Sequence, residues 1–123
     1  MRIIYIKDTG KYGRGIYAAC DIKKGEFIEE APLIVIPKDE WKQMRKSILS
    51  NYVFQWGEHK AIALGYGSLY NHSYTPNARY HTNVDNCTIL FYAFSDIKTG
   101  DEITVNYNGD PYDNSPLWFD VID

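Results

Sequence analysis

The sequence predicts one small domain that is mainly β, with one short helix. Its 123 residues are enough for a single core, because a chain of this length buries roughly two-thirds of the surface that it exposes when extended. Hydrophobic residues make up 45% and charged residues 24% of the chain, which are ordinary values for a globular domain. Short apolar runs separated by glycine, proline and acidic residues recur along it, as is typical of strands joined by tight turns.

The first third of the chain predicts extended segments. Residues 2–7 (RIIYIK) form an apolar strand, a glycine-punctuated loop follows at 9–15, and a second strand covers 16–22. After the turn KKGE, residues 26–37 form a further extended stretch. We expect Pro32 to interrupt it, because proline has no N–H to donate to a sheet.

The best helix prediction covers residues 39–49. Asp39 can serve as its N-cap, and four apolar side chains fall on one face at helical spacing. These four are Trp41, Met44, Ile48 and Leu49. Further short strands are predicted at 61–65, 78–84, 88–94 and 102–107, before an irregular tail.

An internal echo links two distant parts of the chain. AACDIKKGEFI (18–28) and AFSDIKTGDEI (93–103) share the pattern A-x-x-D-I-K-x-G followed by an acid. Each copy predicts a strand, a lysine-bearing turn with glycine at a positive φ, and a second strand. The echo is too short for a repeat architecture. We therefore expect two similar corners within one β-rich body.

Charge is unevenly distributed along the chain. Residues 1–60 carry 11 Lys/Arg and 8 Asp/Glu, a net +3, whereas residues 61–123 carry 2 and 8, a net −6. An acidic half favours a cationic partner and disfavours direct binding of nucleic acid. No apolar run approaches the roughly 18 residues of a membrane span, and the first residues lack the apolar core of a signal peptide. An intracellular protein without a membrane partner is expected.

Metal chemistry has little support in the sequence. Cys20 and Cys87 are far apart and form no CxxC pair, so a cysteine zinc site is excluded, and two buried thiols are preferred over one disulfide. His72, His81 and Asp85 keep open the interpretation of a small metal-dependent hydrolase. Their spacing matches no zinc pattern, and no metal is expected.

Three short motifs hold the polar groups of interest. They are Y-G-R-G-I-Y-A (12–18), N-H-S-x-x-P-N (71–77) and D-I-K-x-G-D-E-I-T-x-x-Y (96–107). Taken separately, each fits an ordinary turn, a hydrogen-bonded corner or an edge strand. The 11 tyrosines, four of them between positions 66 and 80, indicate in addition a lined pocket, because buried tyrosines need hydrogen-bond partners.

In this order and spacing, the three motifs resemble those of the SET-domain protein-lysine methyltransferases. The resemblance covers about residues 3–109 and is greatest to the minimal, single-domain SET proteins of bacteria and large viruses. It implies small curved β-sheets with a C-terminal pseudoknot, in which the last segment passes beneath the loop that holds Asn71 and His72. It further implies a catalytic SET domain at 1–109 and a tail at 110–123 that closes the cofactor and lysine pockets.

The resemblance implies S-adenosyl-L-methionine as the methyl donor, and Tyr107 as the catalytic residue that orients the amine and the methyl group. The cofactor-binding residues that it implies are Tyr12, Gly13, Arg14, Gly15, Tyr70, Asn71, His72, Tyr107 and Trp118. The implied walls of the substrate-lysine channel are Tyr52, Tyr66, Tyr80 and Val105. Val105 stands where relatives tend to carry Phe or Tyr, and a smaller side chain there favours di- or trimethylation, whereas Tyr80 argues against it.

The expected function is methyl transfer to a lysine in a basic protein segment, such as a histone tail. The zinc clusters that close the site in many relatives have no counterpart here, so the tail or a second copy in a homodimer is expected to close it. The expected location is the cytoplasm of a bacterium, or the host nucleus for a viral protein or secreted effector. The alternative is a non-catalytic SET-like module that binds basic peptides, although such a module would not need a cofactor pocket.

Overall fold

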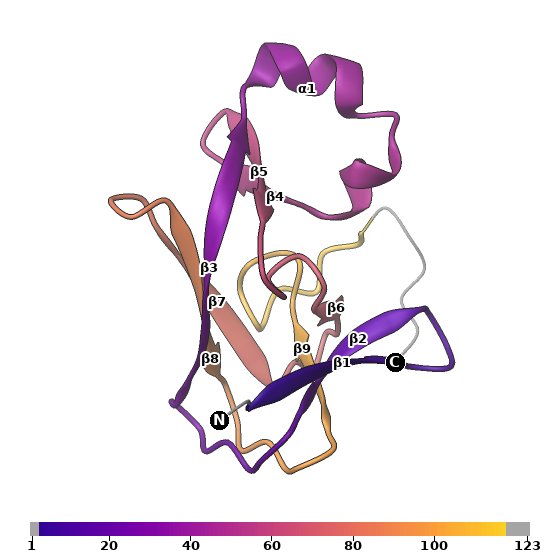
Figure 1. Ribbon diagram of the computed structural model, residues 1–123, viewed down its shortest axis with the longest axis vertical. Coiled ribbons are helices and arrows are strands. Elements are labelled where there is room, and N and C mark those ends of the chain that lie inside the picture. Colours follow the sequence, from indigo (N-terminus) through magenta and orange to yellow (C-terminus); the bar gives the residue numbers. More distant parts are fainter. Residues whose placement is uncertain (1–2, 118–123) are drawn as a thin grey trace.

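The computed structural model describes residues 3–117, which form two curved sheets on either side of one core (Figure 1). The strand order is β1-β2-β9-β6 in the four-stranded sheet and β4-β5-β3-β8-β7 in the five-stranded sheet. In chain order the elements are β1 (Ile4–Asp8), β2 (Arg14–Ala18), β3 (Phe27–Ile36), α1 (Lys38–Met44), the 3-10 helix η1 (Ile48–Asn51), β4 (Val53–Trp56), β5 (His59–Ala63), β6 (Asn71–His72), β7 (Ala78–Asn83), β8 (Thr88–Ala93) and β9 (Glu102–Val105). The mainly β prediction is confirmed.

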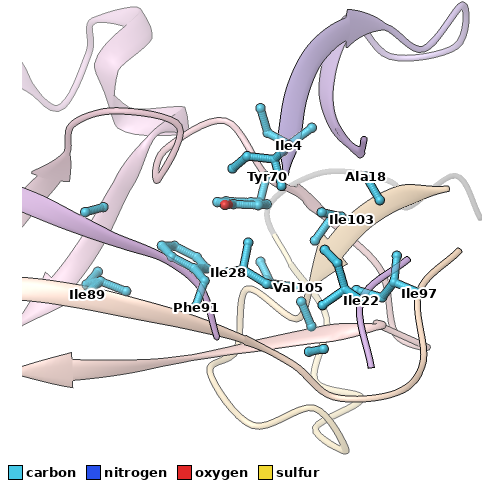
Figure 2. Close-up of a cluster of buried hydrophobic side chains, with 14 of the residues drawn as sticks. Ile4, Ala18, Ile22, Ile28, Tyr70, Ile89, Phe91, Ile97, Ile103 and Val105 are labelled. Carbon is cyan, nitrogen blue, oxygen red and sulfur yellow. The ribbon is translucent and has the colours of Figure 1, made fainter. Parts of the chain in front are cut away.

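The core lies between the two sheets and follows from strand alternation. Ile89 and Phe91 of β8 point inward and are fully buried, while their neighbours along the strand are half-buried. Ile103 and Val105 of β9 meet them from the other sheet (Figure 2). Because side chains alternate between the two faces of a strand, these short runs are sufficient to define which face is buried.

The two copies of the sequence echo pack against each other as two matching corners. Ile22 of the first copy and Ile97 of the second form an isolated antiparallel bridge, and both side chains are buried. Gly25 and Gly100 occupy equivalent turns with φ of +87° and +89°, as the sequence predicts. The two copies of the echo are therefore similar because they form equivalent turns that pack against each other.

The hydrogen bonds between the two corners are reciprocal. Asp21 accepts the backbone N–H of Thr99 at 2.8 Å, and Asp96 accepts the backbone N–H of Lys24 at 2.8 Å. In both cases the aspartate of one copy caps the turn of the other, with equivalent residues 75 positions apart (21 and 96, 24 and 99). The two corners are thus related by a local two-fold arrangement. The first corner connects β2 to β3, and the second connects β8 to β9.

The helix is shorter than predicted, because Ser47 ends it. The Ser47 backbone N–H and hydroxyl both donate to the Met44 C=O, at 2.9 Å and 2.6 Å. The same hydroxyl caps η1 by accepting the Leu49 N–H. The start also differs, since Pro37 occupies the N-cap position without a side-chain hydrogen bond and Asp39 lies within the first turn.

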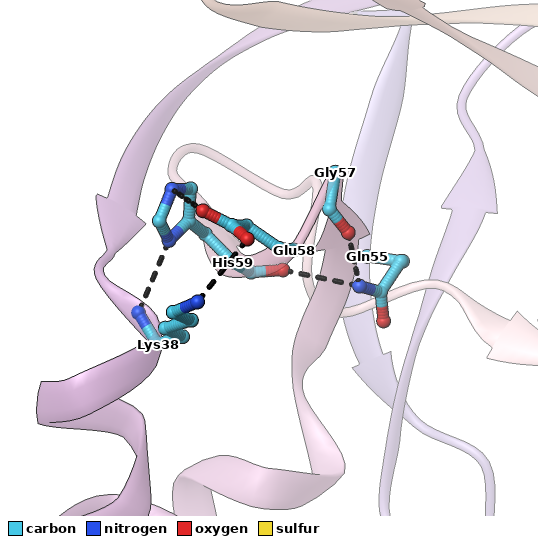
Figure 3. A network of polar contacts seen from close by, with 5 residues as sticks. All are labelled: Lys38, Gln55, Gly57, Glu58 and His59. Carbon is cyan, nitrogen blue, oxygen red and sulfur yellow. Dashed lines mark hydrogen bonds and ion pairs between the residues drawn. The ribbon is translucent and has the colours of Figure 1, made fainter.

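The apolar face predicted for that helix does not reach the core. Neither α1 nor η1 contains a buried residue, and Ile48 is 71% exposed. Instead α1 begins against the β4–β5 hairpin, where the Lys38 backbone N–H donates to His59 Nδ1 at 3.1 Å and Lys38 Nζ pairs with Glu58 (Figure 3). An exposed ion pair of this kind adds little stability, so the contact orients the helix more than it stabilises the domain.

The pairing corrects the predictions for two strands, β3 and β2, and adds two strands that were not predicted, β4 and β6. β3 runs through Pro32 because its partner changes there, from β8 up to Pro32 to β5 from Leu33 onward. The missing N–H therefore costs at most one ladder hydrogen bond. β2 ends at Ala18 and not at residue 22. β4 and the two-residue β6 were not predicted, because neither has a run of alternating apolar residues long enough to indicate a strand.

Both cysteines are free thiols and half-buried, so the disulfide alternative is excluded. Between residues 3 and 117, no helix is long and apolar enough to cross a membrane.

Asp21 gives a test of the paired corners. Its hydrogen bonds from Thr99 hold the pKa of the Asp21 carboxyl below its usual value, so the folded state prefers the ionised form. The stabilisation is therefore complete above the unfolded-state pKa of about 3.9 and is lost as the pH falls through the lower folded-state pKa. We expect Asp21→Asn to lower the free energy of unfolding at pH 7, and the difference from wild type to shrink below about pH 3.9.

Urea denaturation at pH 7 and at pH 3 measures this difference. Asp85→Asn is the matched control, since Asp85 lies exposed in the β7–β8 turn. A difference between wild type and Asp21→Asn that persists unchanged at the lowest pH would contradict the assignment.

Candidate functional site

The site is built where β6 runs parallel to β9, at the end of the four-stranded sheet. Asn71 pairs with Thr104 and His72 with Val105, and the ladder continues with the Ser73 N–H donating to the Val105 C=O at 3.0 Å. β9 lies between β2 and β6, so residues of the last motif are inserted beside those of the first and second motifs. This is the crossing that the resemblance implies.

Asn77 fixes the loop that follows β6 onto β9. Its Oδ1 accepts the Thr104 N–H at 2.9 Å, and its Nδ2 donates to the Glu102 C=O at 2.8 Å. One side chain therefore satisfies two backbone groups of β9. Pro76 precedes it and is buried, which explains why the second motif ends in proline and asparagine.

The parallel pairing of β6 with β9 is called the seam below. A cavity of about 260 Å³ opens beside it. Its walls are contributed by η1 and β4 (residues 51–55), by the loop before β6 (67, 68 and 70), by β7 (80 and 82) and by residues 107–109 after β9. Tyr52, Tyr80 and Tyr107 line it together with Tyr70. The structure thus brings together tyrosines from four separate segments.

Two residues predicted for the channel lie elsewhere. Tyr66 is half-buried and packs against the core cluster, and it is not among the residues that line the cavity. Val105 is 1% exposed and belongs to the core itself. The alternation of β9 explains its position, since Val105 points inward with Ile103, to the opposite side from Thr104.

Two tyrosines of the cavity, Tyr80 and Tyr107, are neutral phenols. Burial raises the pKa of Tyr80 to about 12. Burial, with smaller contributions from Tyr52, Glu102 and Tyr80, raises the pKa of Tyr107 far above its usual value. Each hydroxyl therefore keeps its proton at neutral pH, and the cavity wall offers hydroxyl groups and ring faces, not a general base.

Tyr107 is held by both its side chain and its backbone. Its hydroxyl donates to the Tyr70 C=O at 2.6 Å, and its N–H donates to His72 Nδ1 at 2.9 Å. Because His72 Nδ1 accepts a hydrogen bond, the neutral ring carries its proton on Nε2. The His72 ring also packs edge-on against Tyr74, with centroids 4.5 Å apart. The His72 side chain thus supports the crossing.

The hydrolase interpretation finds no ligand set. Among residues 3–117, no group of three His, Cys, Asp or Glu side chains is arranged to hold a metal ion. His72 has Nδ1 engaged by the Tyr107 N–H. His81 is exposed on β7, where its ring packs against Tyr92.

A second polar cluster centres on Glu102, and none of its members lines the cavity. Glu102 Oε1 accepts the Tyr12 hydroxyl at 2.6 Å, and Oε2 accepts Asn71 Nδ2 at 2.8 Å. Asn71 Nδ2 also donates to the Arg14 C=O at 2.9 Å. A Cβ on Gly15 would stand 2.9 Å from Asn71 Nδ2 and closer still to Glu102 Oε2. The first motif therefore needs glycine there for close packing.

Glu102 is a site residue that the sequence interpretation missed. It lies within the quoted third motif, next to the inward-pointing Ile103, and an acid at the start of a strand reads as a solvent-exposed residue. The signal that could have found it is positional. Glu102 is opposite Tyr17 in the ladder between β9 and β2, so its side chain lies on the same face of the sheet as Gly15, two residues before Tyr17.

The described part of the tail is attached next to the cavity. Asn106 Nδ2 donates to the Asp113 C=O at 2.7 Å, and Asn108 Nδ2 donates to the Ser115 C=O at 2.9 Å. The Tyr74 hydroxyl also donates to the Ser115 C=O. The predicted cofactor residue Trp118 lies outside the described residues.

The comparisons agree with this geometry. The sequence profile of the SET domain matches residues 13–108. A histone-lysine N-methyltransferase of Schizosaccharomyces pombe, specific for H3 lysine-37, is 35% identical over 117 residues, which cover 94% of this chain and 76% of that protein. A human histone-lysine N-methyltransferase, specific for H3 lysine-36, is 33% identical over 112 residues, which cover 81% of this chain and 4% of that protein.

Solved structures show the same fold. A candidate histone methyltransferase of Plasmodium falciparum superposes with a TM-score of 0.72 at 34% identity, covering 87% of this chain and 94% of that chain. A chain of the Chaetomium thermophilum Polycomb Repressive Complex 2 superposes with a TM-score of 0.70 at 25% identity, covering 85% of this chain and 14% of that chain.

Asn77 gives a test of the seam. Removing its side chain leaves two partly buried backbone groups of β9 without their partner, so Asn77→Ala should lower the free energy of unfolding by about 1–3 kcal/mol. Chemical denaturation measures the change. Asn86→Ala, in the exposed turn between β7 and β8, should stay within about 0.5 kcal/mol of wild type. Equal stability of the two variants would show that Asn77 does not hold β9.

Proposed function

The chain belongs to the SET-domain family, and from that premise we propose that it transfers methyl groups from S-adenosyl-L-methionine to a lysine in a basic protein segment. The observation that carries the proposal is the convergence of Tyr52, Tyr80 and Tyr107 around one cavity beside the crossing of β6 and β9. The relatives named as histone-lysine N-methyltransferases support lysine as the acceptor.

The Glu102 cluster fits the proposed cofactor by charge and by shape. The cofactor carries a sulfonium and an ammonium group, and the Glu102 carboxylate with the Arg14 C=O supplies the negative and acceptor groups that such cations need. Gly13 has a φ of +87° and no heavy atom within 4 Å of the place of a Cβ, so its backbone can be approached closely. We assign Tyr12, Gly13, Arg14, Gly15, Asn71 and Glu102 to holding it.

When bound, S-adenosyl-L-methionine supplies an electrophilic methyl group on sulfur. The protein must then present a lysine amine that is neutral and aligned. The tyrosine rings form a cavity of about 260 Å³, and desolvation inside such walls lowers the pKa of a lysine amine, so that its proton is released to water. Ring faces attract the lysine cation before it loses that proton.

Tyr107 acts in this cavity as a hydrogen-bond acceptor. Its hydroxyl hydrogen is directed at the Tyr70 C=O, and its raised pKa keeps that hydrogen in place. The oxygen can then accept a hydrogen bond from the incoming amine or a weak C–H contact from a polarised methyl group. This aligns the nucleophile without a covalent intermediate.

Charge near the cavity supports a basic substrate. Residues 61–123 carry 2 Lys/Arg and 8 Asp/Glu, a net −6. Two of these acids, Asp110 and Asp113, lie within four residues of the last cavity residue, Gly109. A peptide rich in lysine and arginine would be attracted to this rim, and histone tails have that composition.

The central test is intact-mass spectrometry of mixed histones and basic peptides after incubation with the protein and S-adenosyl-L-methionine. We expect mass increases in methyl-sized steps. Tyr107→Phe removes only the hydroxyl and should lower kcat by roughly 10²-fold, because alignment of the amine is lost. The number of steps also reports how many methyl groups one lysine accepts.

Tyr5→Phe is the matched control, since Tyr5 lies on β1 and its ring stacks on Tyr17 away from the cavity. Cofactor binding without methyl transfer to any tested protein would argue for another acceptor class. Absence of both binding and transfer would favour the non-catalytic peptide-binding module.

Gly15 tests the cofactor side of the proposal. Gly15→Ala would push a Cβ against Glu102 and Asn71, and overpacking of this kind costs about 1–3 kcal/mol. We expect the affinity for S-adenosyl-L-methionine, measured by calorimetry, to fall at least about fivefold. Asn86→Ala, in the exposed turn between β7 and β8 and outside this cluster, should leave the affinity within about twofold. Equal effects of the two changes would contradict the role of the cluster.

A further inference from the structure

A β-bulge directs one acidic side chain of β3 into the protein interior. Phe27 pairs with Tyr92 but Glu29 pairs with Phe91, so Ile28 is an extra residue in β3. Opposed residues of an antiparallel pair lie on the same face, and Phe91 is fully buried. Glu29 therefore points inward, although regular alternation after the buried Ile28 would have pointed it outward. Bulges commonly re-aim a side chain in this way near functional sites.

The Glu29 carboxylate holds the loop that precedes β6 at two points. Its Oε1 accepts the Tyr70 hydroxyl at 2.7 Å, and its Oε2 accepts the Tyr66 backbone N–H at 3.1 Å. Gly65 lies against it with a φ of +61°, and a Cβ there would stand 2.7 Å from Glu29 Oε2. The loop conformation and the carboxylate are therefore matched to each other, with no room for another residue at position 65.

The same loop forms one wall of the cavity and ends at the acceptor of the Tyr107 hydroxyl. Gly67 sits so close to β3 that a Cβ would stand 2.7 Å from the Ala31 Cβ, and Gly67 lines the cavity. Tyr70 is 2% exposed, its ring stacks on Phe91 with centroids 4.4 Å apart, and its C=O accepts the Tyr107 hydroxyl at 2.6 Å.

We propose that Glu29 is a positioning residue for Tyr107, acting through Tyr70 across the two sheets. The carboxylate fixes the Tyr70 ring, the ring fixes the Tyr70 backbone, and the Tyr70 C=O fixes the direction of the Tyr107 hydroxyl. Burial, reinforced by the Glu29 charge, raises the pKa of the Tyr70 hydroxyl, which keeps the donor end of this chain protonated. The inference rests on the proposed function in so far as Tyr107 orients the substrate amine.

The test uses two conservative changes that each weaken the same link, because Gln has one acceptor oxygen where the Glu29 carboxylate uses two. Glu29→Gln keeps the shape of the side chain and removes its charge, and Tyr70→Phe keeps the ring on Phe91 and removes the hydroxyl. We expect each to lower kcat about tenfold, since small misplacements of aligning groups have effects of this size or larger, with KM for peptide and cofactor changed less than about twofold. The double variant should be no slower than the slower single variant.

Glu30→Gln is the matched control. Glu30 neighbours Glu29 on β3 but is exposed and accepts the Thr88 hydroxyl on the outer face. Its kcat should equal that of wild type. If Glu29→Gln and Tyr70→Phe lower only the melting temperature, and kcat of the folded protein stays unchanged, the positioning role is overturned.

A spectroscopic measurement separates this inference from the proposed function, because it needs no turnover. Protein labelled with ¹³C at tyrosine Cζ reports the hydrogen bonding of each hydroxyl, and Tyr107→Phe identifies the Tyr107 signal. We expect that signal to shift in Glu29→Gln and in Tyr70→Phe, and to stay in place in Glu30→Gln. A Tyr107 signal that is unmoved by all three changes would overturn the inference even in an active enzyme. A shift in a protein that methylates nothing would leave the linkage correct and the proposed function wrong.

Discussion

The two-residue parallel pairing of β6 with β9 is the contact on which the site depends. It joins Asn71 and His72 to Thr104 and Val105, which are far apart in the sequence, and closing such a long loop has an entropic cost before any contact forms. The surrounding hydrogen bonds offset that cost. Asn77 satisfies two backbone groups of β9, and His72 accepts the Tyr107 N–H. Because the pairing is short, these side chains hold the crossing together, and this explains why a polar run lies at the centre of a small protein.

The sequence predicts the family and the class of fold, but it does not predict which tyrosines line the cavity. The three motifs indicate the family because they occur together in one order and spacing, although each taken separately fits an ordinary turn or strand. Helix length was wrong because the Ser47 side chain decides where α1 stops, and periodicity does not report such local competition. Tyr66 and Tyr52 cannot be told apart by residue type. Their placement inside or outside the cavity depends on a loop whose shape is set by Gly65 and Glu29, which lie on different elements.

The electrostatics of the site are carried by two carboxylates and several neutral phenols. Glu102 contacts Tyr12 and Asn71, and Glu29 contacts Tyr70. Between them, buried tyrosines hold their protons. A site of this kind has no strong base of its own, so it favours reactions in which alignment and desolvation are sufficient.

The paired corners at 18–28 and 93–103 also have a consequence for how the protein is made. The ribosome releases the chain from the N-terminus, so Ala18 and Asp21 emerge long before their partners Gly100 and Thr99. Until then β2 has an unpaired edge toward the missing β9, and exposed edges of this kind associate with other chains. The complete four-stranded sheet can therefore form only after β9 has left the exit tunnel, although the β1–β2 hairpin is local. Non-local pairing of this degree is typical of slow-folding domains.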